Sequence, residues 1–306
     1  MGINGPLFYY FLPLFVAMIA IEIWVGKKRG LTLYTKKETS ASIIIGIVQR
    51  LIGLIKISVT GYLGFLVYEN RIYTMPLEDW RIWIILFIAV EFTYYWYHRL
   101  SHEVRWFWAT HAVHHSIEEM NILGSYRLGW TSKISMAYIV NLPLMWIGFS
   151  PASIATMLAL NLFYQSWLHT NLIGKLGILE GVLNTPSAHR VHHARNADYL
   201  DRNHGGVTMI FDRIFNTYVE ERDEEPVEYG LVKPVGSSNP VTIAFHEWVR
   251  MIGDLKTRRP KHWLATMFGP PGWAPDGNSV TSKVLRERYR KRRGEAVDSG
   301  VAIPAE

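Results

Sequence analysis

Eight histidines fall into three tight clusters whose spacing is typical of metal ligands on helices. Side chains three and four positions apart lie on one helix face, with Cβ atoms about 5–6 Å apart, so their imidazoles can converge on one ion. Three such clusters can surround one or two metal ions without any thiolate. The clusters are His98 and His102, then His111, His114 and His115, and finally His189, His192 and His193.

The absence of cysteine narrows the chemistry of this site. The 306 residues contain no cysteine, which excludes disulfides, thiolate zinc sites, cysteine-ligated iron–sulfur clusters and cysteine nucleophiles. Three or four imidazoles suffice for a zinc site, so eight indicate two ions. The zinc-protease signature is absent too, because His246-Glu247 lacks a second histidine four positions on. Iron that activates dioxygen is the best chemical match beside lipid tails, although the spacing alone leaves zinc open.

Five apolar segments predict helices that span a membrane. Hydrophobic residues make up 49% of the chain and charged residues 19%, against about a quarter charged in an ordinary soluble domain. Apolar helices of about 20 residues are long enough to cross the hydrocarbon core. We therefore expect an all-α, multi-pass membrane protein with a histidine-rich cytosolic cap. The predicted spans are Leu7–Val25, Leu51–Tyr68, Trp80–Tyr97, Ile134–Phe149 and Pro151–Leu168.

The distribution of basic residues predicts the orientation. Residues 27–29 are all basic, whereas the tip of the 134–168 hairpin carries no lysine or arginine. By the positive-inside rule, residues 26–41 and everything after Tyr97 except the hairpin tip face the cytosol. The hairpin crosses twice, so all three histidine clusters can meet at the cytosolic edge. The net charge of +6 then lies at the membrane surface, which argues against nucleic acid as a partner.

A polar stripe on the last apolar segment supplies a ninth candidate ligand. Asn161, Gln165 and His169 follow one another at intervals of four residues on an otherwise apolar helix. Polar side chains in a membrane segment need partners, so this stripe is expected to face inward, with His169 at its cytosolic end. Glu91, seven residues before His98, is a candidate hydrogen-bond partner for a ligating imidazole or a proton-handling group.

The three clusters resemble the histidine boxes of a known superfamily of membrane enzymes. His98-Arg-Leu-Ser-His102, His111-Ala-Val-His-His115 and His189-Arg-Val-His-His193 follow the order of the boxes in the fatty acid hydroxylase/sterol desaturase superfamily. Within it the chain is most similar to the alkylglycerol monooxygenase branch and its bacterial relatives. The box resemblance covers about residues 80–220, and further segments, among them Asn203-His-Gly-Gly206 and Gly272–Pro275, extend it to about residue 275.

This resemblance implies a di-iron oxygenase that uses dioxygen and an external electron donor. The eight box histidines would ligate iron with His169 as a further ligand, and the acidic residue after the first box, Glu103, would be catalytic. The donor in related enzymes is tetrahydrobiopterin, cytochrome b5 or ferredoxin, and the sequence does not select among them. Relatives generally carry tyrosine at the position of His204, which either adjusts the edge of the site or adds a tenth nitrogen. His246 and His262 are interpreted as ordinary core or surface histidines.

The expected function is hydroxylation of a lipid C–H bond by a di-iron membrane oxidoreductase of lipid metabolism. Its histidine site and its C-terminus are expected on the cytosolic side. A C-5 sterol-type lipid desaturase with the same site is an alternative, and a membrane metal transporter is a more distant one. A metal-dependent lipid hydrolase is disfavoured, because eight histidines exceed what a hydrolytic zinc site needs. The expected partners are a membrane lipid and a separate electron-donor protein or pterin, while the particular lipid and the oligomeric state are left open.

These patterns predict four parts of the chain. Residues 1–79 hold N-terminal transmembrane helices and a basic loop, and residues 80–220 form the histidine-box catalytic domain. Residues 221–275 form a cytosolic extension that ends in a Pro/Gly-rich segment. Residues 276–306 are basic and are expected to be a disordered tail.

Overall fold

A computed structural model describes residues 6–55 and 59–294, which form helices joined by loops. Isolated β-bridges occur in these two ranges but no strand does, so the predicted all-α class is confirmed there. The longer helices are α1 (Pro6–Lys28), α2 (Lys36–Gly53), α3 (Val59–Glu69), α4 (Trp80–Glu103), α5 (Arg105–His115), α8 (Pro151–Ser166), α11 (Pro240–Thr257) and α13 (Ser282–Arg292). The shorter ones are η1 (Ile122–Tyr126), α6 (Ser132–Ser135), η2 (Ala137–Asn141), α7 (Leu142–Ile147), η3 (Gly177–Leu179), α9 (Pro186–His192), α10 (Ile210–Ile214), η4 (Pro260–His262) and α12 (Trp263–Phe268).

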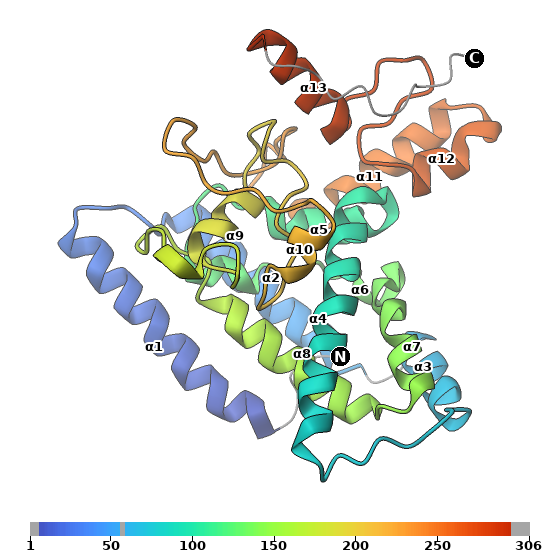
Figure 1. Cartoon of the computed structure of the whole chain (residues 1–306). Coiled ribbons are helices and arrows are strands. Elements are labelled where there is room, and N and C mark those ends of the chain that lie inside the picture. The colour runs from blue at the N-terminus through green and yellow to red at the C-terminus, as the bar shows by residue number, and fades with distance from the viewer. Residues whose placement is uncertain (1–5, 56–58, 295–306) are drawn as a thin grey trace.

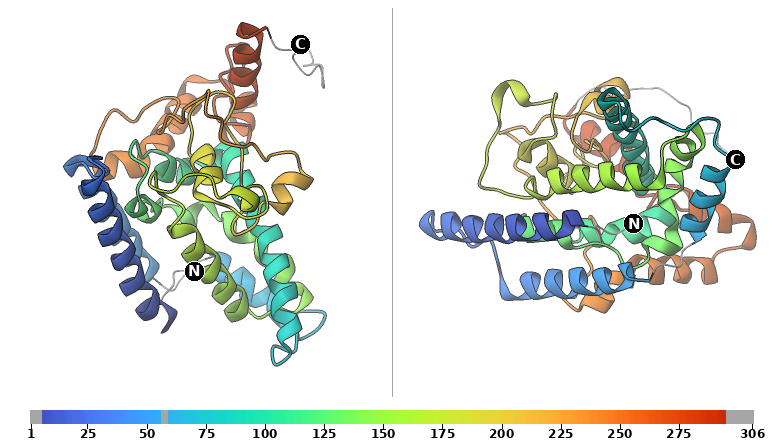
Figure 2. Two further views of the ribbon diagram at one scale, coloured as in Figure 1. Left: turned by 60° about the vertical axis from the view of Figure 1, so that its left-hand side comes forward. Right: turned by 90° about the horizontal axis from the view of Figure 1, so that it is seen from below.

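The lower half of the fold consists mainly of long helices, and the upper half holds loops and short helices together with α11 and α13. Helices α1, α4 and α8 extend through the lower half of Figure 1, and α9 and α10 lie above them. Helices α11, α12 and α13 lie together at the upper right, and the view turned by 60° again places α13 at the top (Figure 2). Helix α4 packs against α5, α8 and α10, and α11 packs against α5 and α2. Helices α4 and α5 therefore join the two halves.

Several helices begin at capping residues that the sequence marks clearly. Ser150, Thr185 and Asn239 are the N-caps of α8, α9 and α11, and proline follows each of them. The side-chain oxygen of each cap accepts a hydrogen bond from a backbone N–H of the first turn, where proline removes no helical hydrogen bond. Helix α9 has only seven residues, and the cap at Thr185 contributes to holding the third histidine cluster in place together with the burial of Val191.

Three apolar cores in the described residues hold the helices that carry the histidines, and one of them includes Val191 of α9, within the third histidine cluster. In the lower half, buried side chains of α4, α7 and α8, among them Leu86 and Ile154, form one core. In the upper half, Ile45 of α2, Val113 of α5 and Ile243 of α11 form a second core and are fully buried. Because Val113 lies within the second histidine cluster, its burial fixes the rotation of α5 about its own axis.

The prediction of one spanning helix over Leu51–Tyr68 is wrong. Helix α2 ends at Gly53 and α3 begins only at Val59. The carbonyl of Ile55 accepts a hydrogen bond from the side chain of Lys133, a partner outside the helix. Glycine weakens a helix, and this tertiary contact gives the chain an alternative to continuing it.

The prediction of one helix over Ile134–Phe149 is also wrong, because the segment is divided into α6, η2 and α7. Met136 has a left-handed backbone conformation with φ of 57°, which ends α6. The resulting bend brings Asn141 to α4, where the hydroxyl of Thr93 donates to its side-chain oxygen at 2.9 Å. The hydrogen bond satisfies two buried polar side chains that would otherwise lack this partner.

The expectation of a disordered tail at residues 276–306 is wrong for helix α13. This helix is held against the upper half of the protein by its basic side chains. The guanidinium of Arg286 donates to the carbonyl of Leu200 at 2.5 Å, and that of Arg290 pairs with Asp198 at 3.2 Å. The last residues of the predicted tail lie outside the described part of the chain.

The other three predicted spans lie on helices. Leu7–Val25 falls within α1, Trp80–Tyr97 within α4, and most of Pro151–Leu168 on α8. None of the helices in the described ranges combines the length and the apolar character that crossing a membrane requires. The five membrane crossings therefore stay a prediction.

A buried carboxylate on α4 ties the loops of the upper half to the long helices. Glu91 accepts hydrogen bonds from the backbone N–H groups of Val207 at 3.0 Å and Thr208 at 2.7 Å. It also accepts from the hydroxyl of Thr208 at 3.0 Å and from the amide of Asn161 on α8 at 2.5 Å. Asn161 in turn accepts from Gln165 at 2.5 Å, and both side chains are buried. The predicted inward orientation of this stripe is thus confirmed, although Glu91 holds the loop rather than a histidine.

Replacing Glu91 by glutamine tests this connection. The glutamine side chain brings an NH₂ group among donors, so at least one buried N–H loses its acceptor. We expect the free energy of unfolding to fall by about 2–4 kcal/mol, measured by urea denaturation. Glu78→Gln, at an exposed position just before α4, is the control and should change it by less than about 0.5 kcal/mol. Equal stability of the two variants would contradict the role of Glu91.

Candidate metal centre

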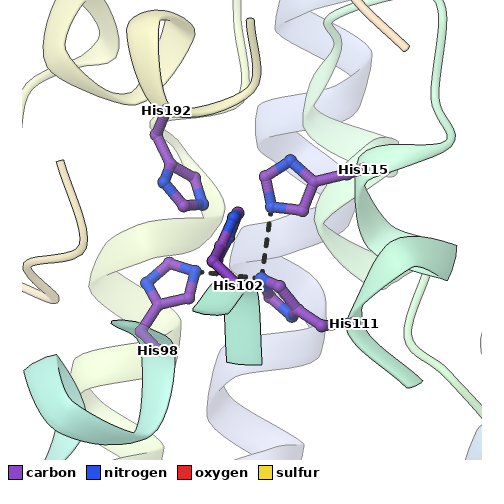
Figure 3. A group of neighbouring side chains, drawn as sticks. All are labelled: His98, His102, His111, His115 and His192. Atoms are coloured by element: carbon purple, nitrogen blue, oxygen red, sulfur yellow. Dashed lines mark hydrogen bonds between the residues drawn. The ribbon is translucent and has the colours of Figure 1, made fainter. Parts of the chain in front are cut away.

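Five of the predicted ligands form one buried group, which we call group one. His98 and His102 come from α4, His111 and His115 from α5, and His192 from α9, and their rings face a common centre (Figure 3). Each ring offers one nitrogen as a ligand atom, and these five nitrogens all lie within 4.8 Å of one another. The Nε2 atom of His111 is 3.1 Å from Nε2 of His98 and 3.2 Å from Nε2 of His115.

The other four predicted ligands form a second group, group two. His114 of α5, His169 after α8, and His189 and His193 at α9 each offer a nitrogen within the same 4.8 Å limit. The Nε2 atom of His169 is 3.2 Å from that of His114 and 3.0 Å from that of His189. The two groups adjoin, since the stacked rings of His193 and His115 have centroids 4.4 Å apart. The structure therefore brings all nine predicted histidines together.

One short loop, residues 201–204, orients three rings of group one. His98 and His192 each contact a backbone carbonyl of this loop through Nδ1. A carbonyl can only accept a hydrogen bond, so Nδ1 of these two imidazoles carries the proton. Their Nε2 atoms are then each left with a free lone pair on the side of the group. The pairs are His98 with the carbonyl of His204 (2.9 Å), His192 with the carbonyl of Arg202 (2.9 Å), and His102 with the carboxylate of Asp201 (3.3 Å).

The loop itself has an unusual backbone conformation. Asp201 and Asn203 have φ angles of 51° and 57°, in the left-handed region that aspartate and asparagine tolerate better than most residues. The buried carboxylate of Asp212 accepts from the backbone N–H groups of His204 and Gly205, each at 2.7 Å. Burial raises the pKa of the Asp212 carboxyl to about 6, although these hydrogen bonds act in the opposite direction. Asp212 thus holds the loop in the shape that presents its carbonyls to the histidines.

Burial keeps the clustered imidazoles neutral. It lowers the pKa of His169 to about 4, with the carbonyl of Gln165 acting in the opposite direction. For seven other members, burial and then the neighbouring imidazoles hold the pKa well below the ordinary value. Neutral imidazole is the form that binds metal ions. These seven are His98, His111, His114, His115, His189, His192 and His193.

The donor atoms fit metal ions. Nε2 of His102, Nε2 of His192 and both nitrogens of His193 are buried without a hydrogen-bond partner among the residues that the structure describes. Each such atom costs about 1–3 kcal/mol if it stays unpaired. A cation at the centre of each group would pair with several of them at once. Donor sets made only of imidazole nitrogen suit iron, zinc, copper and nickel.

Glu103 lies outside both groups. Its side chain is 40% exposed, and its carboxylate accepts from the guanidinium of Arg99 at 2.8 Å. The same guanidinium donates to the hydroxyl of Tyr95 at 3.1 Å. The catalytic role of Glu103 stays a prediction.

His204 is fully buried beside group one but is not a member of it. Its ring centroid is 5.1 Å from that of His102, and neither ring nitrogen has a hydrogen-bond partner in the described ranges. His246 makes an ordinary core contact, because its Nδ1 donates to the carbonyl of Ile243 at 2.7 Å. His262 lies at the start of α12, with its ring centroid 6.0 Å from that of Trp273.

Two cavities reach the groups from different sides. The larger, of about 450 Å³, extends from group one into the upper half and has several charged residues in its wall. The smaller, of about 50 Å³, adjoins both groups through His111 and His114 and has aromatic side chains in its wall. The charged wall residues of the larger cavity include Arg105, Asp201, Glu247, Arg250 and Asp254, and the aromatic ones of the smaller cavity are Tyr97, Phe107 and Tyr138.

The sequence placed His204 at the edge of the site, but its residue types and spacings did not mark Asp201, Arg202, Asn203 or Asp212 as parts of it. Two of the three acceptors in the loop are backbone carbonyls, a group that every residue type has. A weak signal was present, because Asp201-Arg-Asn-His-Gly-Gly206 is rich in residues that tolerate left-handed backbone. It follows the third cluster closely, where a loop that returns to the site is expected.

Known proteins resemble this chain over the range that holds both groups. The sequence model of the fatty acid hydroxylase family matches residues 83–217. Human alkylglycerol monooxygenase is 35% identical over 280 residues, which cover 86% of this chain and 59% of the human protein. The alkylglycerol monooxygenase of Xenopus tropicalis is 34% identical over 271 residues, 87% of this chain and 58% of that protein. An ornithine lipid hydroxylase of Rhizobium tropici is 26% identical over 148 residues, 48% of this chain and 45% of that protein.

The chain spans about three fifths of the length of the two alkylglycerol monooxygenases. No solved structure matches it significantly. All nine histidines of groups one and two lie within the range matched by the family model. The names of the relatives denote monooxygenases and hydroxylases, which are oxidoreductases. The chain thus carries a fatty acid hydroxylase domain at residues 83–217 and is similar over most of its length to proteins named as monooxygenases.

Proposed function

We propose that this protein is a di-iron monooxygenase that uses dioxygen to hydroxylate a C–H bond of a lipid. The observation that carries the proposal is the division of nine histidines, eight of them buried and His111 half-buried, into two adjoining groups of five and four. Two groups correspond to two ions, whereas a hydrolytic zinc site needs about three histidines and one ion. The names of the relatives point to ether lipids or other membrane lipids as substrates.

Two iron ions bound in groups one and two would supply the redox chemistry that activates dioxygen. The chain's own residues hold the donor nitrogens in place, since the carbonyls of Arg202 and His204 fix two of the rings. Burial holds the pKa of most of these imidazoles below the ordinary value, which favours the neutral form that binds metal ions. One oxygen atom enters the C–H bond, and the other leaves as water after two electrons and two protons arrive from a donor.

The two cavities suggest separate approaches for the lipid and the electron donor. The smaller cavity, beside Tyr97 and Tyr138, faces the long helices and suits part of an acyl or alkyl chain. The larger cavity has charged walls and suits a water-soluble reductant or the contact face of an electron-transfer protein. We propose that the donor, whether a pterin, cytochrome b5 or a ferredoxin, acts from that side.

We also propose that the lower half of the protein lies in a membrane, with both groups at its cytosolic edge. Large apolar side chains stand exposed on the long helices, with exposed fractions of 60% for Ile21, 55% for Phe65 and 55% for Ile88. Exposed apolar surface of this kind marks an interaction site, and lipid is the partner that the substrate class requires. The charged residues of α11 and α13 lie in the opposite half.

Labelled dioxygen tests the reaction. Membranes from cells with and without the gene are incubated under isotopically labelled dioxygen, and their lipids are analysed by mass spectrometry. We expect a lipid that gains one labelled oxygen atom. For an ether lipid hydroxylated beside the ether oxygen, the hemiacetal breaks down to a glycerol and an aldehyde, and the aldehyde carries the label.

Other results would favour the alternatives. A lipid that loses two hydrogens without gaining label would indicate a desaturase of the C-5 sterol type. The absence of any oxygen-dependent change in membranes shown to contain the protein would favour metal binding or transport. Activity recovered only in the soluble fraction would contradict the membrane placement.

Substitutions in the two groups test the need for two ions. His192→Ala removes a ligand of group one and His114→Ala removes a ligand of group two. We expect each variant to retain about one iron per chain and to lose at least about 100-fold in oxygenation rate. His262→Ala, outside both groups, is the control and should keep both irons. Full activity of His114→Ala would contradict a di-iron mechanism.

Metal removal is expected to make stability depend on pH. Histidine in an unfolded chain titrates near pH 6.5, whereas burial lowers the pKa of the clustered imidazoles in the folded chain. Below that pH the unfolded chain binds more protons, so the metal-free protein loses stability as the pH falls. Each unit of pKa lowering corresponds to about 1.4 kcal/mol per imidazole. Urea denaturation of chelator-treated protein between pH 7 and pH 5 measures this loss, and a constant midpoint would contradict it.

A further inference from the structure

Asp201 joins a histidine of group one to the C-terminal helix. One oxygen of its carboxylate faces Nδ1 of His102 at 3.3 Å, and the other accepts a hydrogen bond from the hydroxyl of Ser282, the first residue of α13. Asp201, His102 and Ser282 all lie in the wall of the larger cavity. Metal-ligating histidines generally donate their second nitrogen to such a carboxylate, which fixes the tautomer and the orientation of the ring.

Helix α13 holds the same segment of chain at two further points. The guanidinium of Arg286 donates to the carbonyl of Leu200 at 2.5 Å, directly before Asp201. One turn later along α13, Arg290 pairs with Asp198 at 3.2 Å. Three side chains of α13 at intervals of four residues thus contact residues 198–201. This is the pattern of one helix face docked on a loop rather than of a solvated tail.

The segment that α13 contacts orients histidines of group one and none of group two. The loop that begins at Asp201 also supplies the carbonyl acceptors of His98 and His192, which belong to group one. In group two, His169 is oriented from α8 instead, where its Nδ1 donates to the carbonyl of Gln165 at 3.1 Å. A disturbance at Asp201 should therefore reach one ion and spare the other.

We propose that Asp201 is a positioning residue for His102 and that helix α13 acts on group one through it. The proposal rests on the proposed function, because it needs an iron ion in group one. Asp201 accepts from Nδ1–H of His102 and thereby turns Nε2 toward the ion, while Ser282 fixes the second carboxylate oxygen. The C-terminal helix is then a structural part of one half of the metal centre.

Two substitutions at position 201 separate positioning from folding. Asparagine tolerates the φ of 51° found there and keeps a side-chain oxygen as acceptor, so Asp201→Asn retains the loop but loses the negative charge. Asp201→Ala removes the acceptor altogether. Ser282→Ala removes only the hydrogen bond from α13, and Lys283→Ala, the exposed next residue of the same helix, is the matched control.

The measurement is the number of irons that each purified holoenzyme retains after equilibration with increasing chelator. We expect Asp201→Asn to lose one iron at about tenfold lower chelator than wild type, and Asp201→Ala at up to about 100-fold lower. The second iron should leave at the wild-type chelator concentration in both variants. Ser282→Ala should shift the first loss a few-fold in the same direction, and Lys283→Ala should not shift it.

Two results would overturn the proposal. One is wild-type retention of both irons in Asp201→Asn and Asp201→Ala. The other is parallel loss of both irons while the metal-free variants unfold at the wild-type temperature, which would mean that Asp201 does not act on group one alone. A wild-type holoenzyme that does not hold two irons would instead overturn the proposed function, so the two failures are distinguishable. If metal-free Asp201→Ala unfolds below the wild-type temperature, its iron loss reflects a folding defect. The iron retention of Asp201→Asn, which keeps the loop, then decides between the outcomes.

Discussion

Nine imidazoles face one another in a buried space, and the rest of the structure exists to keep them there. Several of their nitrogens have no partner among the described residues, which is unfavourable for the chain alone. The apolar cores around Leu86 and Val113 therefore stabilise an arrangement that the histidines themselves do not favour. A fold whose stability comes from elsewhere can keep ligands neutral, oriented and close together, which is what a buried redox metal requires.

The convergence of the histidines could be predicted from the sequence because its determinants are local, but their division into groups one and two could not. A spacing of four residues places His111 and His115, or His189 and His193, on one helix face whatever the remainder of the chain does, and each of these pairs falls in one group. The helix breaks could not be predicted in this way. Met136 turns left-handed so that Asn141 can reach Thr93 of α4, a partner 48 positions away in the sequence. Hydropathy along one segment contains no information about such a contact.

The acceptors that orient the ligands could not be predicted from the sequence either, for a different reason. The acceptors at Arg202 and His204 are backbone carbonyls. Every residue type has such a group, so no side-chain pattern marks these two positions. Their positions depend on Asp212, eight residues after His204, which holds the loop through the backbone N–H groups. The prediction of a disordered tail was wrong for α13 because it rested on composition alone, which is that of a solvated basic segment. Its docking depends on acceptors at residues 198–201 that become visible only in the folded chain.

Helix α5 contributes to both groups, and this sharing has a consequence for the distance between the two groups. His114 and His115 are neighbours in sequence, yet His114 belongs to group two and His115 to group one, with ring centroids 5.5 Å apart. At α9, His192 and His193 are divided between the groups in the same way, with centroids 5.3 Å apart. The spacing between the two groups is thus limited at two places by covalent geometry. Any small molecule that bridges them must match a gap that the polypeptide backbone has already determined.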